Sequence, residues 1–306
     1  MARQYRDYLS EFNTWEQKPH AKKWLIFPEN IGPYLSIDET ALSRGELYTI
    51  ITNKSAKGKK GSIVAIFAGT KIEPIVEELL KISLEKRVKV KEITLDMANS
   101  MKIIAKKCFP KAIQVTDRFH VQKLAIEALQ DIRIKHRWDA IDLENEQIKQ
   151  ARLTNTTYRS QMFDNEDTRK QLLARSRYLL YKSPQNWTEN QYQRSRILFK
   201  EYPDIKLAYD LVQGLRNIFN TTTSIQVGYT KLAHWYKDVE QSGFKTFNTV
   251  ANTITVNYRS ILNYFINRST NASAESFNAK IKAFRAQFRG VKNVEFFLFR
   301  LTTIFA

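Results

Sequence analysis

An α/β fold, with a mixed β-sheet interrupted by an all-helical insertion, is predicted by three features of the sequence. Short apolar runs at 35–37, 47–51 and 63–67 indicate three early strands. Strand and helix patterns then alternate, which implies a parallel part of the sheet. From about 126 to 266 the strand signals nearly vanish and apolar residues recur at helical spacing. Three antiparallel strands followed by β-α-β units is the order of an RNase H-like core, although ferredoxin-like and other mixed sheets give similar patterns.

The first elements follow from local residue types. Residues 1–33 are polar and basic with aromatic anchors, and Pro28 and Pro33 mark their exit, so we expect an N-terminal helical arm. The connection at 53–61 is rich in Gly, Ser and Asn, which predicts an antiparallel hairpin between the second and third strands. Its four lysines should make this hairpin an exposed basic tip.

The middle of the chain alternates between the two periodicities. Apolar spacing predicts a helix over 71–86, a strand ending at Asp96, a helix over 97–109 and a strand over 113–116. In the helical stretch, the turn signals are Ser183-Pro184, Tyr202-Pro203 and Ser242-Gly243. A final helix follows a group of cap-competent residues that begins at Ser269.

These elements divide the chain into four segments. We expect the helical arm at 1–33, the first part of the RNase H-like core at 34–135, the all-helical insertion at 136–266, and the last part of the core at 267–306.

Composition narrows the class of function. The formal net charge of +18 attracts polyanions and makes nucleic acid the first suspected partner. No apolar run is long enough to cross a bilayer, and the first ten residues lack the apolar centre of a secretory signal. Cys108 is the only cysteine, which excludes an internal disulfide and a cysteine-built zinc site and fits the cytoplasm. The four histidines are dispersed, so oxygen atoms should hold any metal ion.

Three chain segments each offer one carboxylate. Asp38 follows the strand at 35–37, Asp96 follows the strand that ends before it, and Glu275 lies in the first turn of the last helix. Two-metal phosphoryl transfer needs carboxylates that converge from several segments, and the first and fourth strands of an RNase H-like sheet are neighbours. A single acidic residue beside a strand is as often structural. By spacing alone, other carboxylates are equally eligible, namely Glu39, Glu46 and Glu92.

Four motifs, in order, resemble those of DDE transposases of bacterial insertion sequences, in the ISL-type branch. The resemblance runs from about residue 34 to the end of the chain. Its motifs are Ser36-Ile37-Asp38-Glu39-Thr40, Thr94-Leu95-Asp96-Met97-Ala98, Asp117-Arg118-Phe119-His120-Val121 and Thr270-Asn271-Ala272-Ser273-Ala274-Glu275-Ser276-Phe277-Asn278-Ala279-Lys280-Ile281-Lys282.

The resemblance implies a magnesium-dependent transposase that cleaves at transposon ends and transfers strands into target DNA. Asp38, Asp96 and Glu275 would be the catalytic metal ligands for Mg²⁺, with Mn²⁺ expected to substitute. Asp117 and His120 resemble an Asp-x-x-His element, which implies a place for His120 near the scissile phosphate; a histidine satisfied in the core is the plainer alternative.

A basic surface for double-stranded DNA is expected around these residues. Asp117, Arg118 and Asn278 would contact DNA, although a solvated surface residue is the plainer reading of Arg118. The helix after Glu275 would carry a basic ramp for DNA, although a solvated helix face is an equally good explanation of the same charges. The basic residues of this ramp are Lys280, Lys282, Arg285 and Arg289. Tryptophans of the insertion could stack on an unpaired base, but we expect them to be core; they are Trp138, Trp187 and Trp235.

One departure from the family concerns DNA recognition. Many relatives carry an N-terminal zinc module and helix-turn-helix, and residues 1–33 are too short and lack cysteine for either. We therefore expect a separate DNA-binding polypeptide, or the insertion, to supply end recognition. The remaining expectations are a homodimer or larger assembly during synapsis, no membrane partner, and a cytoplasmic protein at the nucleoid. The rival functions are an RNase H-like nuclease that cuts without joining and an inactive, transposase-derived DNA-binding protein.

Overall fold

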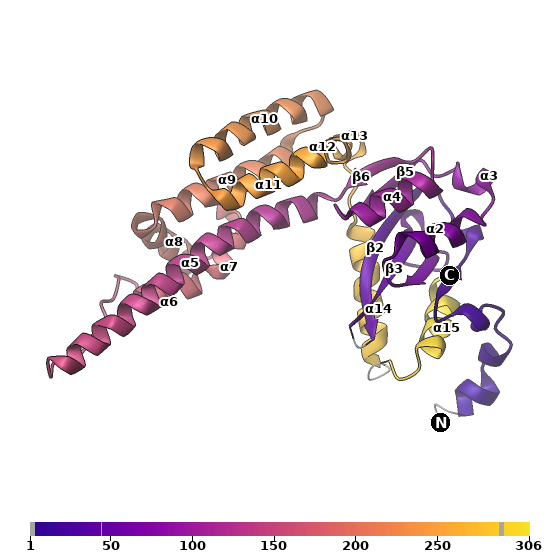
Figure 1. Cartoon of the computed structure of the whole chain (residues 1–306), viewed down its shortest axis with the longest axis horizontal. Coiled ribbons are helices and arrows are strands. Elements are labelled where there is room, and N and C mark those ends of the chain that lie inside the picture. Colours follow the sequence, from indigo (N-terminus) through magenta and orange to yellow (C-terminus); the bar gives the residue numbers. More distant parts are fainter. Residues whose placement is uncertain (1–3, 44, 288–290) are drawn as a thin grey trace. The chain divides into compact units, whose positions relative to one another are not determined.

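A computed structural model describes residues 4–43, 45–287 and 291–306 and divides the chain into two units (Figure 1). The core unit comprises residues 1–118 and 259–306, and the helical unit comprises residues 119–258. No helix in these described ranges combines the length and apolar character that crossing a bilayer would need. Arg289, the last residue of the expected basic ramp, lies outside the described residues.

Six strands form one mixed sheet in the core unit, in the order β1-β4-β3-β2-β5-β6. The strands are β1 (Trp24–Ile26), β2 (Tyr34–Ser43), β3 (Glu46–Asn53), β4 (Ile63–Ala68), β5 (Glu92–Leu95) and β6 (Ile113–Thr116). β2, β3 and β4 pair antiparallel, whereas β5 and β6 continue the sheet in parallel from β2. The predicted mixed α/β fold and the 53–61 hairpin are confirmed.

Each face of the sheet carries its own helices because side chains alternate along a strand. Ile37 and Leu95 belong to an apolar cluster with α2 (Ile72–Leu80) and α4 (Asn99–Cys108). Leu42 and Ile50 belong to a second cluster, with α14 (Ala272–Gln287) and α15 (Val294–Phe305). Two pairs of helices therefore enclose the sheet, and the residues that alternate with Ile37 and Leu95 point toward the α14 face. The expected helix over 71–86 is broken into α2 and the short α3 (Leu84–Arg87).

The N-terminal segment is not the helical arm that its polar composition predicted. It consists of single turns at Tyr5–Leu9, Glu11–Asn13, Lys18–His20 and Pro28–Asn30, with β1 between the last two. β1 pairs antiparallel with β4, so Leu25 lies opposite Ile66 in the second apolar cluster. Only three residues form β1, and pairing at the sheet edge stabilises a strand whose local pattern is too short to detect.

The helical unit is built mainly of α-helices, in the part of the chain where the sequence predicts an all-helical segment. Its α-helices are α5 (Arg118–Leu153), α6 (Arg169–Arg175), α7 (Arg177–Tyr181), α8 (Glu189–Glu201), α9 (Pro203–Thr221), α10 (Ile225–Ser242) and α11 (Lys245–Val256). The helices are interrupted at the three predicted turn positions. A 3₁₀ turn begins at Pro184, Pro203 is the first residue of α9, and Gly243, with φ of 71°, ends α10.

The units divide at different residues from the expected segment boundaries. The expectation placed the insertion at 136–266, whereas the helical unit spans 119–258. α5 is one helix of 36 residues that runs through the expected boundary at 135 without a break. The return path continues through α12 (Tyr258–Leu262) and α13 (Tyr264–Asn267) to α14.

Candidate active site

Asp38 and Asp96 come from neighbouring parallel strands at the same level of the sheet. Ser36 of β2 is paired with Thr94 of β5, so two residues further on Asp38 is level with Asp96, directly beyond the end of β5. Both aspartates are half-buried. Each also accepts the backbone amide that follows it: Asp38 Oδ1 from Glu39 at 2.9 Å, and Asp96 Oδ1 from Met97 at 2.5 Å. The two carboxylates are thus held by their own chain.

Glu39 adds a third carboxyl group to this end of the sheet. Burial raises the pKa of Glu39, and the negative charges of Asp96 and Asp38 raise it further. The carboxyl group of Glu39 therefore lies within electrostatic range of both aspartates. Glu39 is therefore nearer to the aspartates than either Glu46 or Glu92, the other carboxylates that the sequence left open.

α14 brings the distant end of the chain to the same place. The side-chain amide of Asn278 donates to Asp38 Oδ2 at 2.7 Å, and α14 runs alongside β2 (Figure 1). Glu275 is exposed and lies one helical turn before Asn278, in the first turn of α14. The buried side of the helix is apolar; its members in the second cluster are Phe277, Ile281 and Phe284.

The donor chemistry fits a hard divalent cation, although a complete cage is not assembled. Carboxylate oxygens are the ligands that Mg²⁺ and Mn²⁺ favour. Within residues 4–43, 45–287 and 291–306, no three Asp, Glu, His or Cys side chains form a ready-made metal site. The candidate ligands for such an ion in the core unit are therefore the two aspartates and Glu275 on the adjacent helix.

Two predicted DNA-binding residues lie after β6. Asp117 is buried, and its backbone amide donates to the carbonyl of Leu95 at 3.1 Å. The guanidinium of Arg118 lies 5.8 Å from the ring centre of Tyr264, within reach of a cation–π contact. His120 belongs to the first turn of α5 in the helical unit, where it is half-buried and its ring is 5.8 Å from that of Phe119.

The basic residues of α14 differ in their surroundings. Lys280 donates its ammonium group to the carbonyl of Gly58 at 2.8 Å, which ties α14 to the β3–β4 connection. Lys282 is exposed and Arg285 half-exposed. Together with Glu39 and Asn278, these two side chains line a cavity of about 640 Å³ beside the Asn278–Asp38 contact. A cationic wall therefore adjoins the carboxylates.

Comparisons of the sequence with known proteins show which family the chain belongs to. Residues 35–301 match the sequence profile of a family described as transposases, the ISL3-type DDE group. The chain belongs to this family. It is 22% identical over 276 residues to the transposase for insertion sequence element IS1001 of Bordetella parapertussis, across 89% of the chain and 61% of that relative. It is 29% identical over 137 residues to the transposase for insertion sequence element IS1557 of Mycobacterium tuberculosis, across 44% of the chain and 30% of that relative.

The matched regions thus span less than two thirds of the length of each of these two transposases. No solved structure matches the chain at the same level of significance. The family resemblance predicted from the sequence motifs is confirmed.

Two lysines of this transposase-family chain lie near the carboxylates but were not predicted from the sequence to do so. Burial lowers the pKa of Lys102, on α4, and the negative charge of Asp96 opposes this shift, so the two groups are close. Lys54 was expected on an exposed tip but is turned inward, where burial lowers its pKa and the charges of Glu92 and Asp117 oppose the change. Many lysines occupy similar local contexts, and nothing in the sequence distinguishes these two.

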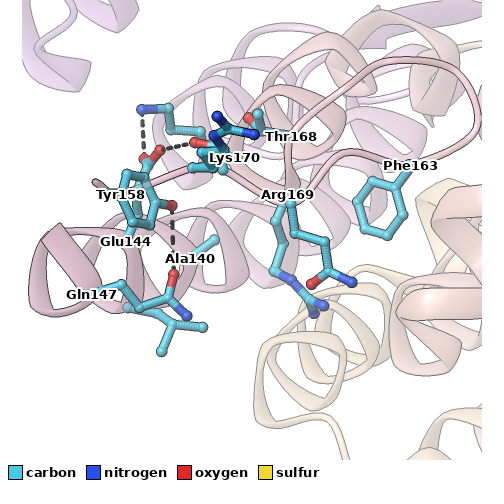
Figure 2. A pocket seen from close by; sticks show the side chains of 12 residues that line it. Ala140, Glu144, Gln147, Tyr158, Phe163, Thr168, Arg169 and Lys170 are labelled. Carbon is cyan, nitrogen blue, oxygen red and sulfur yellow. Dashed lines mark hydrogen bonds and ion pairs between the residues drawn. The ribbon is translucent and has the colours of Figure 1, made fainter. Parts of the chain in front are cut away.

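The helical unit of this family member has a cavity of about 310 Å³ between α5 and the loop before α6 (Figure 2). Glu144 on its wall accepts hydrogen bonds from Lys170 at 2.5 Å and from Ser160 Oγ at 3.1 Å. Tyr158 donates to Gln147 at 3.5 Å. These contacts fasten the loop to α5, and none of the predicted site residues lines the cavity.

The tryptophans of the helical unit have different surroundings. Trp235 is buried and donates its indole N–H to the carbonyl of Leu211 at 2.9 Å, as expected of a core residue. Trp187 is half-buried and donates to Leu179 at 2.8 Å. Trp138, in contrast, is 61% exposed on α5, so the expectation of a core position is wrong for this residue.

Proposed function

We propose that this chain is the catalytic part of a DNA transposase that cleaves at transposon ends and joins the resulting strand to target DNA. The observation that supports this most is the placement of Asp38 and Asp96 at one sheet end, with Asn278 holding the helix of Glu275 against Asp38. Strand order β4-β3-β2-β5-β6 is also that of the RNase H-like core expected from the sequence, with β1 added at the edge.

Asp38, Asp96 and Glu275 would hold Mg²⁺, or Mn²⁺ in its place. Bound there, a pair of ions would activate the attacking oxygen and stabilise the leaving oxygen of a phosphodiester. Because the described residues contain no ready-made cage, Glu275 has to complete the site from the exposed first turn of α14. Asn278 fixes the orientation of Asp38 for this purpose.

The remaining residues would bind and orient DNA. Lys282 and Arg285 line the cavity beside the carboxylates, where their charges would contact the phosphates of double-stranded DNA. Arg118 would contribute at the end of β6, where the buried Asp117 would act by holding the end of the strand and not by contacting DNA, and His120 would act near the scissile phosphate. Lys280 contributes to DNA binding mainly by holding the β3–β4 connection in place.

A strand-transfer assay tests the proposal. Pre-cleaved transposon ends are incubated with the chain, target DNA and Mg²⁺, and joined products are measured beside cleavage of uncut ends. We expect both reactions, and we expect Asp38→Asn, Asp96→Asn and Glu275→Gln each to lower cleavage by at least about a hundredfold while DNA affinity changes little.

The outcomes separate the rival functions. Cleavage without joining would indicate a nuclease, and DNA binding without cleavage would indicate an inactive descendant. Footprinting of the ends shows whether the chain alone recognises them. Full specificity by the isolated chain would remove the need for a separate DNA-binding polypeptide, and sedimentation of the complex with DNA would show whether it is a homodimer.

A further inference from the structure

A buried ion pair lies under the path by which the chain returns to the core unit. The ammonium group of Lys54, in the turn after β3, is 3.6 Å from Glu92 Oε1 at the start of β5. The Lys54 side chain is only 14% exposed and that of Glu92 only 5%. Lys54 also donates to Thr94 Oγ1 at 2.7 Å, so it contacts two residues of the strand that leads to Asp96.

Both members of the pair also hold the returning segment. Lys54 donates to the hydroxyl of Ser269, and Asn267 donates its side-chain amide to Glu92 Oε2 at 3.2 Å. Arg268, between these two contacts, has a left-handed backbone with φ of 51°, which ends α13 and turns the chain. The two polar side chains on either side of this bend are thus bound to the same ion pair.

Further contacts fix the residues just before the bend. Asn263 donates to the carbonyl of Gln114 at 2.9 Å, and the hydroxyls of Ser260 and Thr116 are 2.7 Å apart. The chain is therefore fastened first to β6 and then to β5. After Ser269 it has two more residues before α14 begins at Ala272, and Glu275 follows in the first turn.

Energetics argue for a role in positioning. A buried ion pair adds little net stability, because the loss of hydration offsets most of the attraction. This pair is placed where its hydrogen bonds connect the strand ending at Asp96 with the segment that starts the helix of Glu275. Such a connection limits how α14 enters its place on the sheet.

We propose that Lys54 and Glu92, with Asn267 and Ser269, form a latch that positions the first turn of α14 beside Asp38 and Asp96. The four are positioning residues, because they act through Glu275. Their importance for metal binding rests on the proposed function, whereas their effect on α14 does not.

Removing both charges at constant volume separates position from stability. In Lys54→Met/Glu92→Met, well-packed apolar side chains replace the pair, so the fold should persist, but the hydrogen bonds to Asn267 and Ser269 are lost. Hydrogen exchange in the full chain, without metal or DNA, should become about tenfold faster at 270–278. Exchange within 119–258 should stay unchanged, and so should exchange in the control Lys59→Met, which alters an exposed lysine of the same connection.

A milder variant covers the case in which the double substitution does not fold. Ser269→Ala removes one hydroxyl and leaves the ion pair intact, and it should produce a smaller acceleration at the same amides. Wild-type exchange at 270–278 in Ser269→Ala and in a folded double variant would overturn the latch.

Mn²⁺ titration connects the latch to the proposed site. The double variant should bind Mn²⁺ about tenfold more weakly than wild type, since Glu275 has to be ordered at the moment of binding. Glu275→Gln should also weaken binding. If Glu275→Gln leaves Mn²⁺ affinity unchanged, the proposed ligand set fails, and the hydrogen-exchange result still decides the latch. A different combination would overturn the role of the latch in metal binding. In that case Glu275→Gln lowers Mn²⁺ affinity, whereas the double variant exchanges faster at 270–278 but binds Mn²⁺ as tightly as wild type.

Discussion

Asn278 donates its side-chain amide to Asp38 Oδ2 at 2.7 Å, across 240 positions of the sequence. The other carboxylate oxygen of Asp38 accepts the backbone amide of Glu39. One donor comes from the strand itself and the other from the helix that carries Glu275. This contact therefore couples a proposed metal ligand on the sheet to the element that would supply another.

Substituting Asn278 should lower the rate of cleavage more than the affinity for DNA. In Asn278→Ala, Asp38 loses the side-chain donor that comes from α14, so we expect single-turnover cleavage to fall about tenfold or more. Filter binding should show DNA affinity within about twofold of wild type. Gln287→Ala, at the exposed end of α14, is the control. A normal cleavage rate in Asn278→Ala would mean that this hydrogen bond has no part in the reaction.

The cationic wall beside the carboxylates should show itself in the salt dependence of DNA binding. Each of Lys282→Gln and Arg285→Gln should reduce the slope of log affinity against log salt concentration by about 1, because each removes one phosphate contact. Lys81→Gln, at the end of α2 on the opposite face of the sheet, is the control and should keep the full slope. An unchanged slope in both α14 variants would place the DNA elsewhere.

Local patterns were sufficient to predict five of the six strands of the sheet, β2 to β6, and the neighbouring positions of Asp38 and Asp96. This succeeded because alternation and β-branched residues reflect burial on one face, and because parallel strands end at a common edge. The breaks at Pro184, Pro203 and Gly243 were equally visible, since each residue restricts the backbone by itself.

Features that depend on distant contacts were not predictable in this way. The latch is an example: Asn267 contacts Glu92 across 175 positions, and Lys54 turns inward toward Glu92, which lies 38 positions further along the chain. β1 is stabilised by its pairing with β4, and the Asn278–Asp38 contact depends on how α14 packs. The family resemblance suggested the residues of the proposed site, whereas their hydrogen bonds are seen only in the structure.

The single thiol of the chain should be unreactive in the folded protein. Cys108, at the end of α4, is buried in the apolar cluster beneath the sheet, and burial raises its pKa to about 11. At pH 8 almost none of the thiol is ionised, and the thiolate is the reactive form. Ellman's reagent should label native chain slowly and label chain unfolded in guanidinium at once. Rapid labelling of the native protein at pH 8 would show that α4 opens readily.

A buried aspartate should make the stability of the helical unit depend on pH. The Asp167 side chain is fully buried and accepts hydrogen bonds from Arg175, from Arg194 Nε at 2.8 Å and from Asn165 at 2.9 Å. Burial alone would raise the pKa of Asp167, but the hydrogen bonds and charges of Arg194 and Arg175 outweigh it and leave the pKa below its ordinary value of 3.8. The carboxylate thereby joins α6 to α8.

Because the folded-state pKa is lowered, this stabilisation is present above pH 3.8 and is lost as the pH falls through the folded-state value. Asp167→Asn should therefore lower the free energy of unfolding by about 3 kcal/mol at pH 7. The difference from wild type should shrink below about pH 4 as both chains become neutral at this position. Urea unfolding followed by the fluorescence of Trp187 and Trp235 measures it, with exposed Asp164→Asn as a control expected to stay within about 0.5 kcal/mol. A difference that persists undiminished at the lowest pH would show that packing, and not the charge of Asp167, holds the two helices together.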